Sequence, residues 1–220
     1  MPDPAVRFAD LTLAEFIGRL ASPEPIPGGG SASAIAASLA AALLAMVARL
    51  STGRPKYAAY APTHERAEAA GAAAAAHFLE LADQDAAAYG AFARAVKMPR
   101  ETPEDQETRA AALREAARQS AAVPMEMLRA CRSLAEEIEA MAGRSNLHAA
   151  SDIAVAALLV DAAAHGAAAN VLANLPSVKD ERLEAMTTAD LMLHLKAIED
   201  LAAHAREVAT GGRLRDPEAG

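Results

Sequence analysis

The sequence has no tryptophan, one cysteine and only 3% aromatic residues, although 53% of its 220 residues are hydrophobic. The apolar content must therefore come mainly from Ala, Leu, Val, Ile and Met. Ala has the highest helix propensity, whereas sheets draw on β-branched and aromatic residues, so this composition favours helices. The single Cys131 excludes an intramolecular disulfide and, with no histidine nearby, is expected to be a buried structural thiol.

Basic residues are in the minority as well, with 21 Lys and Arg against 29 Asp and Glu and a net charge of −8. A nucleic-acid-binding surface would leave a basic excess or a visible Lys/Arg cluster, so we expect no nucleic-acid partner. The N-terminal stretch MPDPAVRFAD lacks the basic segment and apolar core of a signal peptide, and the expected location is the cytoplasm.

Helical periodicity, interrupted by Pro and Gly, predicts a single all-α domain over residues 1–220, a multihelical bundle with about six long helices. The predicted helices are Thr12 to Leu20, Ser31 to Leu50, Thr63 to Val96, Glu104 to Met141 with a kink or break at Pro124, Ser151 or Asp152 to Leu175, and Lys179 to Ala209. No alternating stretch predicts a strand, and no linker indicates a second domain.

The segment from Ser31 to Leu50 is long and apolar enough to raise the question of a membrane span. Most of it is Ala or Ser, which drive insertion weakly, so a buried helix without a membrane partner is expected. Large side chains fall on one side of this helix and alanines on another, which makes it central to the fold or to a subunit interface. The large side comprises Ile35, Leu39, Leu43, Met46 and Leu50, and the alanine side Ala34, Ala37, Ala41, Ala45 and Ala48.

Three glycines, Gly28, Gly29 and Gly30, precede Ser31 at the start of that helix. Free N–H groups and the positive end of the helix dipole could face an anion or a carbonyl oxygen there. The run lacks the Lys-Ser/Thr of a P-loop and the spacing of a dinucleotide fingerprint, so nucleotide binding is a poor interpretation. A flexible turn capped by Ser31 is the structural alternative.

Asp85 is the most informative carboxylate, because it falls in the middle of an apolar sector of the third helix. Partial burial there would raise its pKa toward a range useful for proton transfer. A structural salt bridge or hydrogen bond is the alternative. Asp83 points almost oppositely and is expected on a solvated face. Lys56 and Tyr57, in the turn after the second helix, could reach a site around the Gly-rich loop or simply lie at the surface.

The six histidines form neither a His-Glu-x-x-His nor a Glu-x-x-His motif, so no metal is predicted. On the fifth helix, Asp161 and His165 are four residues apart and are expected to form an intrahelical pair.

Several segments, in order and spacing, resemble the family that contains the cyclodeaminase domain of formimidoyltransferase-cyclodeaminase and its bacterial methenyltetrahydrofolate cyclohydrolase relatives. The matching segments are Pro27 to Ser31 (PGGGS), Gly53 to Tyr57 (GRPKY), Asp85 to Tyr89 (DAAAY), Met98 to Glu104 with Arg109 and Val123-Pro124, Asn146, Ser151 to Leu159, and Gly166 to Asn170.

This resemblance implies an all-helical fold that associates as an intertwined homodimer and takes a reduced folate as substrate, with no further cofactor. The proton-transfer carboxylate is expected to be Asp85, assisted by Lys56 and Tyr57. The pterin would contact Asn146 and Asp152, and the Gly-rich loop and Arg109 suit the glutamate tail. Ser151 and Asn170 complete the substrate-binding residues expected from the matched segments.

Two reactions remain open at the same folate carbon. A cyclodeaminase closes 5-formimidoyltetrahydrofolate to 5,10-methenyltetrahydrofolate and releases ammonia, whereas a cyclohydrolase adds water to the methenyl carbon. Both need positioned proton donors and acceptors. Two further alternatives are a folate-binding protein without catalysis and a helical dimerisation module without folate affinity.

Overall fold

The computed structural model describes residues 7–217, and within that range it contains six α-helices and no strand. The all-helical prediction is therefore confirmed. The helices are α1 (Leu13–Leu20), α2 (Gly29–Ser51), α3 (Ala61–Val96), α4 (Pro103–Met141), α5 (Ala150–Asn174) and α6 (Glu181–Gly211). Short 3-10 turns lie at Phe8–Asp10, Pro55–Tyr60, Leu147–Ala149 and Leu175–Val178.

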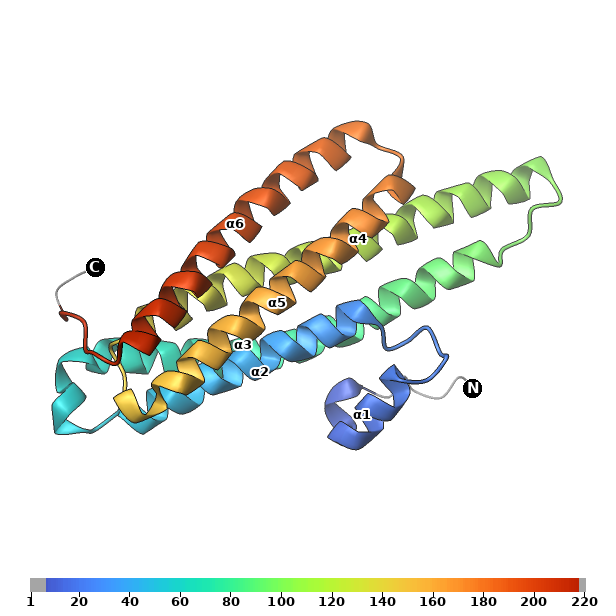
Figure 1. Cartoon of the computed structure of the whole chain (residues 1–220). Coiled ribbons are helices and arrows are strands. Elements are labelled where there is room, and N and C mark those ends of the chain that lie inside the picture. The colour runs from blue at the N-terminus through green and yellow to red at the C-terminus, as the bar shows by residue number, and fades with distance from the viewer. Residues whose placement is uncertain (1–6, 218–220) are drawn as a thin grey trace.

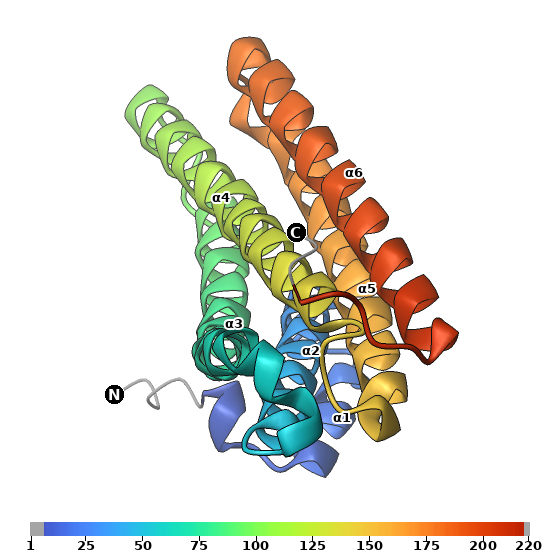
Figure 2. The same ribbon diagram turned by 90° about the vertical axis from the view of Figure 1, so that its left-hand side faces the viewer.

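Helices α2, α3, α4 and α5 form an elongated four-helix bundle in which each packs on the next and α5 returns to α2 (Figure 1). Helix α6 lies against α4 and α5, as the turned view in Figure 2 shows. The short α1 stands apart from the bundle and is connected to α2 by the loop of residues 21–28, while the N-terminal segment Phe8–Asp10 contacts α3. There the Phe8 and Phe16 rings meet edge to face, with centroids 5.5 Å apart.

The alanine side of α2 forms the centre of the core, as its small residues predicted, because all five alanines are buried. Helix α3 approaches this side so closely that a Cβ atom added at Gly71 would lie 2.7 Å from the carbonyl oxygen of Ala41. Real Cβ contacts are longer than this. Glycine at position 71 and alanines on α2 thus set the short distance between the two helices.

Helix boundaries follow local chemistry. Thr12 and Glu15 form a reciprocal capping box at the start of α1, as the sequence predicted for Thr12, and Thr102 and Asp105 do the same for α4. Cys131 is fully buried in α4, and burial raises the pKa of its thiol to about 12, which confirms the expectation of a structural thiol.

Pro124 does not break its helix, so the part of the prediction that allowed a break at this residue is wrong. A proline in a helix has no N–H to donate to the carbonyl four residues earlier, here that of Ser120. The side-chain amide of Asn174 on α5 donates to that carbonyl instead, over 2.8 Å. A tertiary hydrogen bond thus replaces the missing helical one and lets α4 continue.

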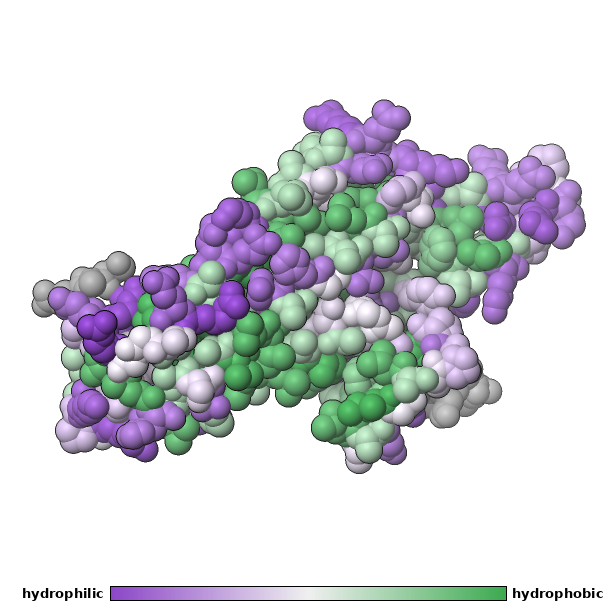
Figure 3. All heavy atoms as spheres, viewed as in Figure 1, coloured by the Kyte–Doolittle hydropathy of each residue, from purple (hydrophilic) through white to green (hydrophobic). Residues whose placement is uncertain are grey.

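The large side of α2 is only partly covered within the chain, because Ile35 and Leu43 pack against the core while the other three residues are exposed. Leu39 is 53% exposed, and Met46 and Leu50 are exposed as well. Val155, Leu158 and Leu172 on the neighbouring α5 are also exposed, and apolar residues gather over this face in Figure 3. The sequence predicted a side suited to burial, and the single chain leaves part of it open. Contiguous exposed apolar surface of this kind marks a contact with another molecule.

Two segments, Gly29–Ser51 and Leu147–Val178, are long and apolar enough to cross a membrane by length and composition. In their most apolar stretches, 50% and 44% of the residues are buried inside the bundle. Core helices of a soluble protein pass the same test, so this criterion does not separate a bilayer from a protein partner.

Candidate active site

A cavity of about 270 Å³ opens at the N-terminal end of α2, between the Gly-rich loop, α3, α4 and α5. Gly28 is the N-cap residue of α2 and has no side chain to cap the helix, and the first turn contains no acidic residue. The cavity therefore faces N–H groups at the positive end of the α2 dipole. The predicted residues Gly28, Gly29, Gly30, Ser31, Asp85 and Asn170 all line it.

Asp85 reaches from α3 to the backbone of α2 at Gly30, which has no side chain to block it. A Cβ atom added at Gly30 would lie 2.3 Å from a carboxylate oxygen of Asp85. The hydroxyl of Ser31 donates to the other carboxylate oxygen over 3.1 Å. The third glycine and the serine of the PGGGS segment thus hold the carboxylate against the start of α2.

The pKa of Asp85 is raised above its ordinary value of 3.8, chiefly because burial penalises the charged form. The hydroxyl and backbone N–H of Ser31 act in the opposite direction by stabilising the carboxylate, and their effect is smaller. A half-buried carboxyl group with a raised pKa, open to a cavity, holds a proton more tightly than an ordinary aspartate and is placed to exchange it with a bound ligand.

Amide and hydroxyl groups line the wall opposite Asp85. Asn170 donates to the carbonyl of Gly166 over 2.8 Å, which fixes its side-chain amide at the cavity edge. Asn174 also lines the cavity, and its side-chain amide donates to the carbonyl of Ser120. The Ser120 hydroxyl is buried, with 8% of the residue exposed, and has no hydrogen-bond partner among the described residues.

An unpaired hydroxyl that lines a cavity is available to a bound ligand. Sequence reasoning missed Ser120. The signal that could have found it is its position four residues before Pro124, where a helix must leave a carbonyl free.

Tyr57 and Asn146 lie together at the other end of α2. The Tyr57 hydroxyl donates to the side-chain oxygen of Asn146 over 3.4 Å and accepts from the backbone N–H of Leu147 over 3.2 Å. The backbone N–H of Asn146 donates to the Ser51 hydroxyl over 2.8 Å. Both predicted residues are buried, and these contacts fasten the loop after α4 to the end of α2.

Lys56 is exposed beside this cluster, and its ammonium lies 5.5 Å from the centre of the Tyr57 ring. Ser151 and Asp152 begin α5 close by, the first exposed and the second half-buried. Arg109 lies elsewhere, on α4, where its guanidinium donates to the carbonyl of Val96 over 3.3 Å and caps the end of α3.

The predicted residues thus form two groups within one chain. Ser31 contacts Asp85 at one end of α2, and Ser51 contacts Asn146 at the other. Twenty residues separate the two serines, which corresponds to about 30 Å along a helix. A folate carbon cannot touch Asp85 and Tyr57 of the same chain at once.

Asp83 does not lie on a fully solvated face, contrary to expectation. It is half-buried beneath the N-terminal segment, where it accepts the backbone N–H of Phe8 over 2.8 Å. Segment 7–11 covers this part of α3, which periodicity within α3 alone could not reveal. Asp161 and His165 form the expected pair, at 3.7 Å, and His165 also contacts Glu199 on α6 at 3.2 Å.

The fold and this cavity define a class of protein: a long helical bundle in which a carboxyl group of raised pKa packs against a Gly-rich helix start. Residues 12–192 match the formiminotransferase-cyclodeaminase family, and the chain belongs to that family. A crystal structure of formiminotetrahydrofolate cyclodeaminase from Thermotoga maritima is similar over 92% of this chain and 98% of its own, with a TM-score of 0.83 and 29% identity.

Two curated relatives represent the two reactions. Formimidoyltransferase-cyclodeaminase of Sus scrofa is 38% identical over 79% of this chain, which spans only 32% of that protein. Methenyltetrahydrofolate cyclohydrolase of Methylorubrum extorquens is 32% identical over 77% of this chain and 81% of its own length. The chain thus covers about a third of the first protein and most of the second.

Proposed function

We propose that this chain is a folate one-carbon enzyme that converts 5-formimidoyltetrahydrofolate to 5,10-methenyltetrahydrofolate with release of ammonia. The observation that carries the proposal is Asp85, a carboxyl group with a raised pKa that faces a polar cavity at the start of α2. The similarity to a cyclodeaminase over 98% of that chain supports the reaction class.

The reaction requires one proton to leave and another to arrive at neighbouring atoms. The formimidoyl group enters protonated, so its terminal nitrogen carries two hydrogens and the group has one positive charge. The N10 amine attacks the formimidoyl carbon on N5, a carbon–nitrogen bond forms, and N10 loses its proton, while the positive charge ends on the methenyl bridge. The bond from the same carbon to the terminal nitrogen then breaks, and that nitrogen must leave as ammonia. Asp85 can accept the N10 proton as carboxylate and deliver it to the departing nitrogen, so the carboxyl group is unchanged after one cycle.

The cavity supplies groups for the pterin ring. The edge of the pterin carries amide and amine groups. These groups suit the side chains of Asn170 and Ser120 and the free N–H groups at Gly29 and Gly30. Contacts of this kind hold N5 and N10 in place relative to Asp85. Arg109 would serve the glutamate tail only if that tail extended along α4, because the guanidinium lies at the end of α3.

The second candidate is cyclohydrolase activity, favoured by the relative whose length this chain covers to 81%. Water then adds to the methenyl carbon and gives one proton to Asp85. As the C–N5 bond breaks, Asp85 returns that proton to N5, and the new hydroxyl loses its proton to solvent to leave the C=O of 10-formyltetrahydrofolate. The same tetrahedral carbon between two folate nitrogens occurs in both reactions, so one arrangement of side chains serves either.

A homodimer is part of the proposal, because it covers the apolar face of α2 and α5 and unites the two groups of predicted residues. A two-fold axis across the middle of α2 would place the Asp85 end of one protomer beside the Tyr57 end of its partner. Lys56, Tyr57, Asn146, Ser151 and Asp152 of one chain would then complete the cavity of the other. The α2 face has no charged residue before Arg49, which suits burial against a second copy.

The reaction is tested by offering the purified protein each folate separately and following methenyl absorbance and ammonia. A rise in absorbance with equimolar ammonia from the formimidoyl compound is the expected result. Loss of absorbance from the methenyl compound without ammonia selects the cyclohydrolase. No change with either compound contradicts the enzymatic proposal, and folate binding without turnover would then identify a binding protein.

The two-chain site is tested by mixing two inactive variants, Asp85→Asn and Lys56→Gln, after separation and reassociation of the protomers. In a random mixture half of the dimers are mixed, and each mixed dimer has one intact site of two, so about a quarter of wild-type activity returns. Sites made within one chain would recover no activity.

The dimer contact itself is tested with the variant Leu39→Glu, which is expected to be monomeric by sedimentation. Association with lipid vesicles instead would favour a membrane on this face.

We also propose that the reduced folate is the only small molecule the reaction needs and that the enzyme acts in the cytoplasm. The single cysteine of the sequence, Cys131, is buried and unpaired, which suits a reducing compartment.

A further inference from the structure

The two asparagines of the Asp85 cavity are each held in one orientation. The side-chain nitrogens of Asn170 and Asn174 donate to the backbone carbonyls of Gly166 and Ser120 respectively, over 2.8 Å in both cases. A carbonyl only accepts hydrogen bonds, so each amide must turn its nitrogen toward the carbonyl and its oxygen away. Neither amide oxygen accepts a hydrogen bond within the part of the chain that the structure describes. These oxygens are therefore the atoms that the asparagines offer to a ligand in the cavity.

The hydroxyl of Ser120 is a third acceptor on this wall. It is buried and has no partner among the described residues, and the Asn174 amide contacts the carbonyl of the same residue. The hydroxyl and the amide oxygen of Asn174 thus belong to neighbouring side chains. Buried polar atoms are nearly always paired in native proteins, which indicates that a group of the ligand completes this pair.

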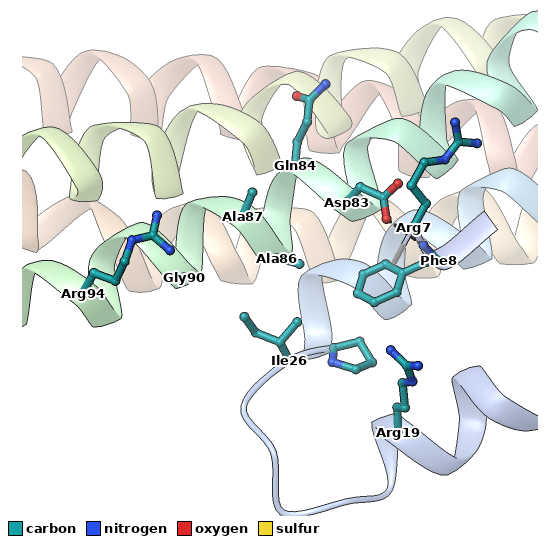
Figure 4. A pocket seen from close by; sticks show the side chains of 11 residues that line it. Arg7, Phe8, Arg19, Ile26, Asp83, Gln84, Ala86, Ala87, Gly90 and Arg94 are labelled. Carbon is teal, nitrogen blue, oxygen red and sulfur yellow. Dashed lines mark hydrogen bonds between the residues drawn. The ribbon is translucent and has the colours of Figure 1, made fainter. Parts of the chain in front are cut away.

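A larger cavity of about 640 Å³ adjoins the Asp85 cavity through shared lining residues, and its charge is of the opposite kind. Asp83 is the only acidic residue described in its lining, and that carboxylate already accepts a backbone N–H. Guanidinium groups, which donate and never accept, surround this cavity in Figure 4, from Arg7, Arg19 and Arg94. A cationic N–H group is therefore better accommodated in the Asp85 cavity, which offers carboxylate, amide and hydroxyl oxygens.

We infer that Asn174 and the Ser120 hydroxyl bind the terminal nitrogen of the formimidoyl group and make the site selective for that nitrogen. The inference rests on the proposed function, because it assigns a contact to the substrate named there. In the protonated formimidoyl group this nitrogen carries two N–H donors, which match one amide oxygen and one hydroxyl oxygen. The hydroxyl keeps its own hydrogen, which it can donate to the pterin carbonyl beside N5.

This contact also orients the nitrogen for departure. After N10 attacks, the carbon is tetrahedral and the terminal nitrogen has two hydrogens and a lone pair. With both hydrogens held on the wall formed by α4 and α5, the lone pair is left to face Asp85 on the opposite wall. Asp85 delivers the proton taken from N10 to this lone pair, the carbon–nitrogen bond breaks, and ammonia leaves with three hydrogens.

The test compares two folates that differ at the terminal atom of the N5 substituent. 5-Formimidoyltetrahydrofolate has the N–H donors, whereas 5-formyltetrahydrofolate has a carbonyl oxygen, which only accepts. Calorimetry measures the binding of both in proteins that carry Asp85→Asn, so that the formimidoyl compound is not consumed. Steady-state kinetics with Asp85 intact measures kcat/KM for the formimidoyl compound.

The variants separate the contact with substrate from the role in the fold. Ser120→Ala removes the unpartnered hydroxyl but keeps the carbonyl that Asn174 contacts, so the free energy of unfolding should not fall. Asn174→Ala is made in a Pro124→Ala background, where the restored helical N–H donates to that carbonyl. Ser133→Ala is the matched control, an exposed serine on the same helix that lines neither cavity.

Asn174→Ala is expected to weaken binding of the formimidoyl compound about tenfold relative to its background and to leave binding of the formyl compound unchanged. Ser120→Ala should weaken the first about tenfold and the second only about twofold, since the bond to the pterin is lost in both. Both variants lower kcat/KM by about ten- to a hundredfold, the range for a hydrogen bond to a charged group. Ser133→Ala behaves as wild type.

Equal weakening for the two folates would overturn the inference, because a contact with the pterin or a disturbed fold affects both alike. Unchanged binding in both variants would overturn it as well, and Ser120→Ala decides alone if the variant in the Pro124→Ala background does not fold.

The inference and the proposed function fail separately. Turnover with an unaltered preference between the folates in both variants removes the nitrogen contact and leaves the enzyme. A preference for the formimidoyl compound that depends on Asn174 and Ser120, without any turnover by the wild type, removes the enzyme and leaves the binding site.

Discussion

The side-chain amide of Asn174 donates to the backbone carbonyl of Ser120, the one carbonyl of α4 that Pro124 leaves without a helical donor. Two segments far apart in the sequence are thereby matched: a proline in one helix requires a donor, and an asparagine in another provides it. Because both Ser120 and Asn174 line the Asp85 cavity, the same contact fixes one wall of the candidate site.

Replacement of Asn174 by Ala leaves that carbonyl buried and unpaired, and is expected to reduce the free energy of unfolding by about 1–3 kcal/mol. In a Pro124→Ala background the cost should be much smaller, since the introduced alanine restores the helical N–H. Urea unfolding of the four proteins in this double-mutant cycle measures the difference. Equal costs in both backgrounds would show that the two residues are energetically independent.

Asp85→Asn is expected to lower kcat by about 10²- to 10⁴-fold, the usual contribution of a positioned acid or base. It should also stabilise the fold at neutral pH. Burial raises the pKa of Asp85 above 3.8, so the folded state binds this proton more tightly than the unfolded chain.

The free energy of unfolding of the wild type therefore falls as the pH rises from 3.8 toward the raised pKa, and it remains lowered by the same amount at higher pH. Asparagine does not ionise, so the stability difference between the variant and the wild type should appear across that interval and vanish at about pH 3. Thermal unfolding at a series of pH values checks this. A variant less stable than wild type at neutral pH would contradict the assignment of the raised pKa.

Gly30→Ala places a methyl group where the Asp85 carboxylate now lies, because the added Cβ would be only 2.3 Å from its oxygen. The carboxylate must move away from α2, and activity is expected to fall about a hundredfold, as for other small displacements of a reacting group. Gly18→Ala on α1 is the control, since its Cβ would meet nothing within 4 Å. A near-normal kcat in Gly30→Ala would show that Asp85 does not transfer protons in the reaction.

Gly71→Ala tests the close approach of α2 and α3 away from both cavities. The new Cβ would lie 2.7 Å from a backbone oxygen and 2.9 Å from a backbone nitrogen, neither of which can rotate away. Overpacking of this kind is expected to reduce the free energy of unfolding by about 1–3 kcal/mol. Gly211→Ala, with open space around it, should instead raise it slightly through helix propensity. Denaturant unfolding compares the two, and a neutral Gly71→Ala would mean that the helices can separate.

Composition, periodicity and turn residues suffice to predict the helices here, because each depends on residues close in sequence. The alanine side of α2 and the cap at Thr12 are examples. A carboxylate in an apolar sector singled out Asp85, and a bare helix start singled out the Gly-rich loop, but only the family resemblance assigned both to one site.

Contacts between distant segments were not predictable in the same way. The bond from Asn174 to Ser120 depends on how α5 packs on α4, and the cover over Asp83 depends on where the N-terminal segment lies. The separation of Tyr57 from Asp85 follows from the length of α2, yet spacing along the chain does not say which end of a helix a later helix meets. These relationships required the three-dimensional arrangement.

The length of α2 has a consequence for how such an enzyme responds to its own concentration. If the two ends of this helix act together only when protomers pair, dilution separates each cavity from half of its side chains. Specific activity would then rise with protein concentration along the dimerisation curve, and substrate bound across both chains would hold them together. Helix α2, whose length separates the two groups of site residues, would thus make dimer formation depend on bound substrate.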